Sequence, residues 1–417
     1  MNFEKIKTKL IDKKNFFIGI LITFLLISVA VLFYRNQALK VSLNQPLTIG
    51  AESNEKVAVP ASIMLTPIST PKPARPDFTD IKAKGLYLTG WTVGDMKKVE
   101  KFVDIANETE INSFVVDIKD DDGYVGYESN IPSVREVKGW KNKYKVEPVI
   151  KAFHDNNIYV IGRIVCFKDP VLAKAKPELA IRNVNGNVWK DKDGRPWLDP
   201  YNEDSWPYII EVAKEGVKNG FDEIQFDYVR FANDGDKRLM DFSKYSPKQK
   251  YEAINEFLDF AKKELPEVKV SADVFGIICE SPADTEGIGQ NLDTVGKKID
   301  FLSPMVYPSH YAVGQIVNNV RFLKPDLDPY GVVYNTMLKA KSRIAQIQDY
   351  KAKMRPYIQN FAAPWLGKGY YQPYRETQVK EQIKAIYDAG YDEWLVWEAT
   401  NSYSLNAFSK ENSEKKP

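Results

Sequence analysis

The feature that most constrains the fold is a regular alternation of short apolar segments with amphipathic helical patterns from residue 84 onward. Eight apolar segments occur, at residues 84–91, 112–119, 158–167, 222–231, 268–276, 300–308, 356–361 and 392–400. Helical patterns separate them, at 95–109, 147–156, 205–219, 247–265, 329–353 and 377–389, with a short one at 291–298. Eight strands alternating with helices predict an α/β chain folded as a (β/α)8 TIM barrel. An open doubly wound sheet is the alternative, but no glycine-rich turn between a strand and a helix supports it.

Two glycines mark expected helix ends. Gly220 and Gly390 each stand between a helical pattern and the next apolar segment. Glycine readily adopts the left-handed conformation that ends many helices. We therefore expect both residues to terminate helices directly before barrel strands.

The N-terminal segment has the pattern of a membrane anchor. Residues 16–33 form an uncharged apolar run, which at about 1.5 Å per residue spans roughly 27 Å, close to the hydrocarbon core of a bilayer. Lysines are concentrated before this run, which predicts a cytoplasmic tail at 1–15. A cleaved signal peptide with a site at residues 28–30 is the competing interpretation, although the apolar run continues past that site. We expect a retained single-pass signal anchor in the cell membrane, with the rest of the chain extracellular.

The remaining boundaries follow from composition. Residues 34–81 contain several prolines among Ser, Thr and Ala without a persistent apolar period, which is typical of a disordered linker. The barrel is expected at 82–405, followed by a charged tail at 406–417.

The residue counts exclude several kinds of site. The chain has 417 residues but only 2 His and 2 Cys, too few for a three-histidine zinc site, a Cys₄ site or a disulfide scaffold. We expect Cys166 and Cys279 to be small core thiols, and we expect no metal and no cofactor. The formal net charge of +2 gives no support for nucleic-acid binding. The oligomeric state is left open.

Polar residues occupy strand positions where a barrel interior should be apolar. Side chains alternate along a strand, so one face packs on helices and the other points into the barrel. We expect the outward set to be Phe114, Val116, Ile118, Ile224, Phe226, Tyr228, Val270, Ala272 and Val274. The inward set then gathers Asp117, Lys119, Arg163, Asp227 and Asp273 at the C-terminal end, where TIM-barrel sites form.

Two carboxylates of this cluster suit cleavage of a glycosidic bond. Asp227 and Asp273 end neighbouring strands about 4.8 Å apart, so their carboxyl groups are expected roughly 5 Å apart, the spacing of retaining enzymes. We expect Asp227 to be the nucleophile, kept ionised by Arg163, and Asp273 to be the acid/base. Glu398, at the end of the last strand, is the reserve acid. A purely structural ion network, with Arg163 between Asp117 and Asp227, is the alternative explanation.

Other side chains near this end are candidates for contact with a sugar. Tryptophans at the mouth can stack on a pyranose, although tryptophans in the core are more usual. A loop histidine or an acidic turn can equally be structural. The substrate-binding candidates are Trp91, Asp117, Lys119, Asp122, Arg163, Gln225, Arg230, Tyr307, His310 and Trp397. The long loop 168–204 is expected to lack regular structure and to wall the cleft.

Six segments of the chain resemble a known family. The segments are KGLYLTGW, VVDIKDDDGYVGYES, GRIVCFKDP, DEIQFDYVRF, SADVFG and SPMVYPSHY. Together they resemble the glycoside hydrolase TIM-barrel domain of bacterial envelope proteins that is catalogued as a domain of unknown function. The similarity covers roughly residues 82–405 and implies a fold distantly similar to the α-amylase-like hydrolases.

That resemblance also implies roles for two residues. In the amylase-like enzymes an Asp ending strand four is the nucleophile and the proton donor follows strand five, which by position implies Asp227 and Asp273. The chain departs from their pattern at three places. Asp273 stands where the amylases carry Glu, Gln225 stands where they carry Arg, and Arg230 follows Asp227 by three positions instead.

Three functions are open at this point. We expect a membrane-anchored extracellular glycoside hydrolase that cleaves O-glycosidic bonds of an envelope or extracellular polysaccharide through two carboxylates. A non-catalytic carbohydrate-binding barrel is the second interpretation. A metal-dependent hydrolase such as a deacetylase is the third, and it is disfavoured because His154 and His310 are the only histidines.

Overall fold

The computed structural model describes residues 76–410. The predicted anchor at 16–33, most of the predicted linker and the last residues of the tail lie outside the described residues. Within 76–410, no helix combines the length and the apolar character needed to cross a membrane.

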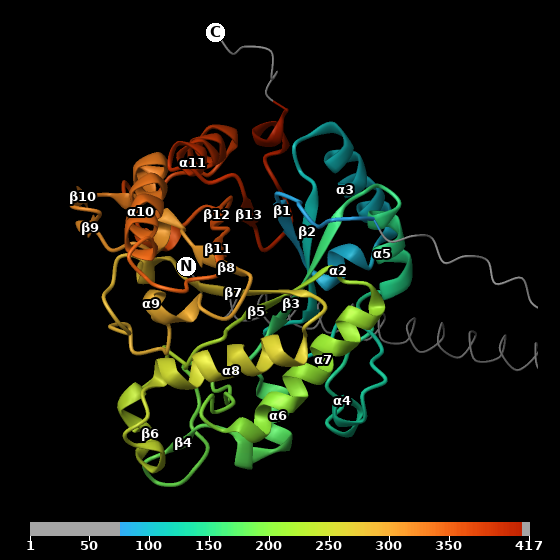
Figure 1. Cartoon of the computed structure of the whole chain (residues 1–417), viewed down its shortest axis with the longest axis vertical. Helices are drawn as coiled ribbons and strands as arrows, with labels where there is room; N and C mark the ends of the chain where they lie inside the picture. Colours follow the sequence, from blue (N-terminus) through green and yellow to red (C-terminus); the bar gives the residue numbers. More distant parts are fainter. Residues whose placement is uncertain (1–75, 411–417) are drawn as a thin grey trace, which may run out of the picture. The chain divides into compact units, whose positions relative to one another are not determined.

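Eight parallel strands form a closed barrel (Figure 1). They are β1 (Lys84–Leu88), β2 (Ser113–Lys119), β3 (Tyr159–Val165), β5 (Glu223–Asp227), β7 (Lys269–Phe275), β8 (Phe301–Met305), β12 (Tyr357–Gln359) and β13 (Trp394–Trp397). They pair in this order, and β13 pairs back with β1. The short β11 (Lys353–Met354) pairs with β8 directly before β12 and shares the seventh position. The predicted TIM barrel is confirmed, and the closure through β13 and β1 excludes an open sheet.

Helices surround the strands (Figure 1). The main ones are α3 (Met96–Glu108), α5 (Val146–His154), α7 (Trp206–Asn219), α8 (Lys250–Glu264), α10 (Pro329–Ile344) and α11 (Glu376–Asp388), and α9 (Leu292–Val295) is a single turn. Gly220 ends α7 with φ 105° and Gly390 follows α11 with φ 81°, so both left-handed ends are confirmed. Helix α10 stops earlier than the predicted 353, because the chain turns back to enter β11.

The core has two apolar layers. The outer layer lies between strands and helices and includes Phe114, Val116, Ile118, Ile224, Phe226, Val270, Ala272 and Val274, all fully buried. The inner layer fills the barrel and includes Tyr87, Val115, Ile161, Tyr307, Tyr357 and Leu395. The predicted outward set is therefore confirmed, with one correction. Tyr228 follows β5 in a left-handed conformation with φ 50°, and its half-buried ring reaches the cleft described below.

A buried ion network occupies the interior near the N-terminal ends of the strands, and the sequence pattern did not predict it. Arg355 donates to the carboxylate of Glu223, and its other terminal nitrogen lies 3.7 Å from a carboxylate oxygen of Glu393. The hydroxyl of Tyr159 donates to Glu223 at 3.1 Å. All four side chains are buried. Each buried charge has an opposite partner, which is the condition for tolerating charge in a core.

The connecting segments carry short elements that lacked a sequence signal. These are α2 (Gly90–Val93), α4 (Pro132–Glu136), α6 (Pro170–Ala175), the antiparallel pair β4 (Arg182–Asn183) and β6 (Met240–Asp241), and the hairpin of β9 (Gln315–Val317) and β10 (Val320–Phe322). The expectation that 168–204 lacks regular structure was wrong. That segment contains α6 and β4 and buries Trp189 and Trp197. Elements of one turn or two residues are too short to produce a periodic pattern.

Candidate functional site

A cleft of about 350 Å³ opens at the C-terminal end of the barrel. Its walls come from β3, β5, β7, β8, β12 and β13 and the segments after them. The lining residues are Arg163, Asp227, Tyr228, Arg230, Asp273, Phe275, Gly276, Ile277, Met305, Tyr307, His310, Tyr311, Tyr357 and Trp397. A larger hollow of about 530 Å³ beside α5 contains none of the predicted catalytic residues. The barrel mouth is therefore the candidate active site.

Arg163 on β3 joins two carboxylates from the neighbouring strands. Its Nε and Nη2 donate to Oδ2 of Asp227 at 2.9 and 2.6 Å, and its Nη1 donates to Oδ1 of Asp117 at 2.7 Å. The hydroxyl of Tyr87 donates to the other oxygen of Asp117 at 2.6 Å. Burial raises the pKa of Asp117, and the charge of Arg163 opposes that shift. The ion network foreseen as an alternative is thus present, but only Asp227 of the two carboxylates lines the cleft.

The backbone holds the second oxygen of Asp227. Oδ1 accepts a hydrogen bond from the amide N–H of Tyr228 at 2.6 Å. Tyr228 adopts φ 50°. This left-handed conformation costs a bulky residue about 1–3 kcal/mol of strain, and residues in it are found most often at functional sites. The local turn after β5 therefore fixes the carboxylate in one orientation at the base of the cleft.

Asp273 on β7 lies next to Asp227 in the cleft and differs from it electrostatically. No Lys, Arg or His of residues 76–410 forms an ion pair with it, and its Oδ1 atom is buried without a hydrogen bond. Burial raises the pKa of the Asp273 carboxyl well above its usual value, and the negative charge of Asp227 raises it further. A carboxyl group that holds its proton more tightly than usual, next to a paired carboxylate, is the arrangement that acid-assisted bond cleavage requires.

Three predicted residues lie away from the cleft. Lys119 follows an irregularity in the pairing of β2 with β3, and its Nζ contacts Asp169 at 2.9 Å, with both side chains fully buried. The expectation that Lys119 joins the inward cluster was wrong, because the shift in register turns its side chain toward the loop after β3. Asp122 is exposed in the turn after β2. Trp91 does not end a strand as expected but lies in α2, 64% exposed.

Two further candidates have internal partners. Gln225 is fully buried below the cleft, where its side-chain oxygen accepts a hydrogen bond from the hydroxyl of Tyr357 at 2.8 Å. Glu398 closes the turn after β13, because one of its oxygens accepts hydrogen bonds from the hydroxyl of Thr400 at 2.7 Å and the amide of Ser402 at 2.8 Å. Neither residue lines the cleft.

Aromatic rings extend from the cleft to the surface. Trp397 stacks on Tyr87 with centroids 4.0 Å apart. The ring centroids of Tyr307 and Phe361 lie 5.5 Å apart, and Phe361 stacks on Trp365 with centroids 6.2 Å apart. Trp365 is 64% exposed. The sequence pattern did not single out Phe361 and Trp365, although Phe361 ends the predicted seventh strand and Trp365 follows it, the region where barrel loops carry functional residues.

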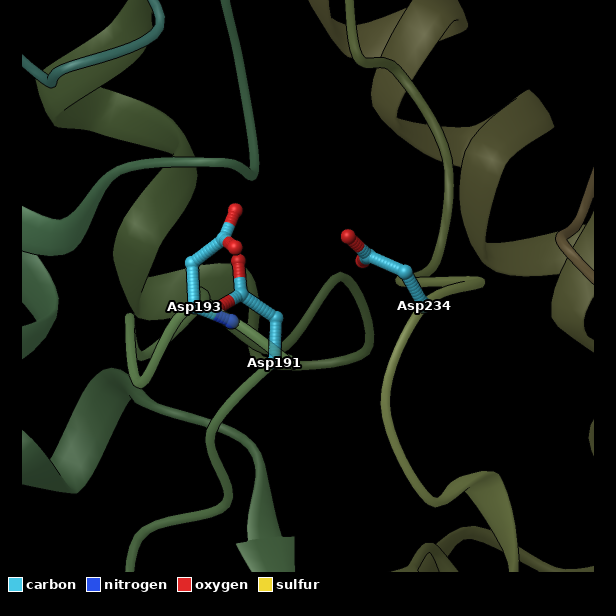
Figure 2. Close-up of side chains that lie close together, drawn as sticks. All are labelled: Asp191, Asp193 and Asp234. Carbon is cyan, nitrogen blue, oxygen red and sulfur yellow. Dashed lines mark hydrogen bonds between the residues drawn. The ribbon is translucent and has the colours of Figure 1, made fainter. Parts of the chain in front are cut away.

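Three aspartates outside the cleft come together in the loop region (Figure 2). Carboxylate oxygens of Asp191, Asp193 and Asp234 lie within 4.8 Å of one another. Arg195 contacts Asp193 at 2.6 Å and Asp191 at 3.6 Å, and the indole N–H of Trp197 donates to Asp191 at 3.1 Å. We therefore assign Asp191 and Asp193 a role in holding the turn between 191 and 197.

Comparison with known proteins identifies the family. Residues 85–403 match the family described as "Putative glycosyl hydrolase domain". The chain belongs to this family. The expected glycoside hydrolase domain is therefore confirmed, and its match spans all eight barrel strands except the first residue of β1. No curated protein matches the chain significantly.

Several solved structures are similar to this chain. A hypothetical protein from Ruminiclostridium thermocellum ATCC 27405 is 64% identical over 46% of this chain and 99% of its own, with a TM-score of 0.44. The glycoside hydrolase domain of PgaB (BpsB) from Bordetella bronchiseptica is 11% identical over 79% of this chain and 99% of its own, with a TM-score of 0.56. Alpha-L-fucosidase isoenzyme 2 from Paenibacillus thiaminolyticus is 14% identical over 78% of this chain and 48% of its own, with a TM-score of 0.52. The last two similarities show a common fold.

Proposed function

We propose that the protein hydrolyses O-glycosidic bonds of a polysaccharide by a retaining mechanism, with Asp227 as nucleophile and Asp273 as acid/base. One observation carries this proposal. Two carboxyl groups face the same cleft, and only one of them has a cationic partner. Their strands β5 and β7 pair in register up to Phe226 and Ala272, so the two residues follow neighbouring positions. This supports the short spacing of retaining enzymes, about 5–5.5 Å.

The proposed chemistry needs two steps. In the first, the Asp273 carboxyl gives its proton to the glycosidic oxygen while a carboxylate oxygen of Asp227 bonds to the anomeric carbon, and the C–O bond to the leaving sugar breaks. In the second, the Asp273 carboxylate takes a proton from water, and the resulting hydroxyl displaces Asp227 from the anomeric carbon. Each residue ends in its starting protonation state. Arg163 compensates the charge of Asp227 before and after the covalent intermediate.

A non-catalytic carbohydrate-binding barrel is the second candidate, and one observation favours it. Both oxygens of Asp227 already accept hydrogen bonds in the free protein, from Arg163 and from the Tyr228 amide. Hydrogen bonds of this kind are also compatible with a purely structural role, in which Asp227 holds the end of the barrel together. The distinction therefore depends on whether bonds are cleaved.

The experiment is a release assay with the full-length chain on cell-wall and capsular glycans, measuring new reducing ends. Wild type is compared with Asp227→Asn, Asp273→Asn and the control Asp392→Asn, whose side chain is exposed and pairs with Lys82. We expect activity in the wild type and the control only. The proposal is contradicted if all four proteins release reducing ends. It is also contradicted if the wild type binds a glycan but releases no reducing ends from any glycan that it binds. Nuclear magnetic resonance of the first-formed anomer tests retention.

We also propose that residues 16–33 anchor the enzyme in the cell membrane with the barrel outside. The support is the apolar run with lysines on its N-terminal side. Cell fractionation of the full chain and of a variant lacking 16–33 tests this. Membrane association of the full chain alone is expected, and equal distribution of both proteins contradicts the anchor.

A further inference from the structure

Arg230 is a buried cation in the cleft that lacks a carboxylate partner. It is 7% exposed, and the rings of Trp197, Tyr228 and Phe275 lie 5.1, 4.8 and 4.8 Å from its guanidinium carbon. Within residues 76–410, no carboxylate oxygen lies within 4.0 Å of a guanidinium nitrogen of Arg230, the distance that defines an ion pair. Arg163, by contrast, has two such partners. Burying a charge without an ion pair costs several kcal/mol, and an anion bound beside Arg230 would offset part of that cost.

The hydrogen bonds of Arg230 leave one edge of its guanidinium free. Nη1 donates to the carbonyl oxygen of Phe231 at 3.0 Å and to the side-chain oxygen of Asn233 at 2.9 Å. Nε and Nη2 donate to no acceptor within residues 76–410. Their two N–H groups point in parallel from the same edge of the planar group. That fork matches the two oxygens of a carboxylate.

The surrounding charge favours a single carboxylate over a phosphate. Lys168 is the nearby second cation, 4.7 Å from the Tyr228 ring, but its Nζ already contacts Asp121 at 3.0 Å. Of the two arginines that line the cleft, Arg163 is paired with carboxylates, and Arg230 has no direct ion pair within residues 76–410, although the charges of Asp227 and Asp234 act on it from a longer distance. A uronate brings one negative charge, whereas a phosphate monoester brings about 1.5–2.

We propose that Arg230 binds the carboxylate of an acidic sugar, so that the substrate class is a polysaccharide containing uronic acid residues. The inference rests on the proposed function only in placing a sugar in this cleft. Binding through Arg230 does not require cleavage, so the two proposals fail separately. The aromatic rings around Arg230 exclude water and strengthen the expected ion pair.

The test is calorimetric titration of the full-length chain carrying Asp273→Asn. This substitution removes the proposed acid, so that a bound substrate is not turned over, and it replaces the carboxyl by an amide of nearly the same shape. The probes are tetragalacturonate and tetraglucuronate, each compared with its methyl ester, which has nearly the same shape without the charge. We expect at least one acid to bind, and to bind about 10- to 100-fold more tightly than its ester.

Variants assign that preference to Arg230. Arg230→Met should abolish the difference between acid and ester. Arg230→Lys should retain only part of it, because lysine keeps the charge without the fork. Arg238→Met is the matched control, since Arg238 is 90% exposed on the same connecting segment and pairs only with Asp236. If Arg230→Met does not fold, the test is whether Arg230→Lys partly loses the preference for the acid over its ester.

The inference is overturned if neither acid binds, if acid and ester bind equally, or if both Arg230 variants keep the preference of the parent protein. Tight binding of a sugar phosphate with no binding of uronates also overturns it. If uronates bind through Arg230 but the wild type cleaves no glycan, the inference stands and the hydrolase proposal fails.

Discussion

Arg163 directs two N–H groups to the same oxygen of Asp227, Oδ2, at 2.9 and 2.6 Å. The other oxygen, Oδ1, accepts one hydrogen bond from the Tyr228 amide. Charge-assisted hydrogen bonds withdraw more electron density than a neutral one. We therefore expect Oδ1 to be the oxygen that attacks the anomeric carbon, with Oδ2 held by Arg163 throughout the reaction.

Removal of the Asp227 carboxylate should abolish hydrolysis and permit chemical rescue. Asp227→Gly is expected to lose at least about 10³-fold in kcat, because no group remains to form the covalent intermediate. Sodium azide fits the space left by the carboxylate and should restore turnover, giving a glycosyl azide of inverted configuration. Mass spectrometry and nuclear magnetic resonance of the product check this. Equal rescue of Asp273→Gly with the same inverted product would reverse the two assignments.

Asp273 predicts how activity depends on pH. Its pKa is raised by burial and by the charge of Asp227, so the carboxyl keeps its proton well above the usual range. Because the protonated form donates to the leaving group, kcat/KM should fall as pH rises through that raised pKa. Asp273→Asn should lower kcat/KM by about 10²–10⁴-fold, and the fall of kcat/KM at high pH (the alkaline limb of the pH profile) should disappear. A substrate with a nitrophenyl leaving group should be much less affected. An unchanged alkaline limb in the variant would contradict the assignment.

The same carboxyl predicts a pH dependence of stability. A folded-state pKa above the unfolded value of 3.8 means that the bound proton stabilises the fold fully below pH 3.8. That contribution is lost as pH rises through the folded-state pKa. Asp273→Asn should therefore gain free energy of unfolding relative to wild type at pH 7.5, and the gain should shrink toward pH 4. Urea unfolding at several pH values measures it, and a pH-independent difference between the two proteins would refute the prediction.

Lys119 should matter for stability and not for chemistry. Lys119→Met leaves the carboxylate of Asp169 buried without its cation, which should lower the free energy of unfolding by about 3–5 kcal/mol. The kcat of the folded fraction should remain that of the wild type, since Lys119 does not line the cleft. Chemical denaturation and kinetics at a temperature where the variant is folded separate the two effects. A large loss of kcat without loss of stability would return Lys119 to the site.

Trp365 should contribute to binding of long substrates. Its ring is 64% exposed and joins the cleft through Phe361 and Tyr307. Trp365→Ala should raise KM for a polysaccharide about 5-fold, because such a ring contact contributes about 1 kcal/mol, and leave KM for a nitrophenyl monosaccharide unchanged. Trp91→Ala is the matched control, because Trp91 is also 64% exposed but lies in α2 outside the cleft. An equal rise in KM for the polysaccharide in both variants would contradict a specific role of Trp365 beside the cleft.

The sequence predicted the barrel well because its signals are periodic. Alternating apolar residues in β2, β5 and β7 assigned the outward faces of these strands, and with them the inward positions of Asp117, Asp227 and Asp273. The errors occur where periodicity is interrupted. An irregular pairing moves Lys119 out of the cluster, and a left-handed residue turns Tyr228 toward the cleft.

Other contacts had no signal at all. Arg355 precedes a proline between two strand segments of two and three residues, so its position in the barrel interior could not be derived from a pattern. Phe361 and Trp365 contact the cleft through rings brought together by tertiary packing. Side chains that meet across the barrel depend on closure, which local sequence does not encode.

The ion network of Glu223, Arg355 and Glu393 has a consequence for how the barrel can be divided. Glu223 stands on the fourth strand and Arg355 at the seventh, 132 residues later. A fragment that ends after the fourth or fifth strand retains the buried acid without its base, and the remaining fragment retains the base without that acid. The two halves are therefore electrostatically interdependent. Half-barrels of this protein should not be stable alone, and separately produced halves should acquire structure only when mixed.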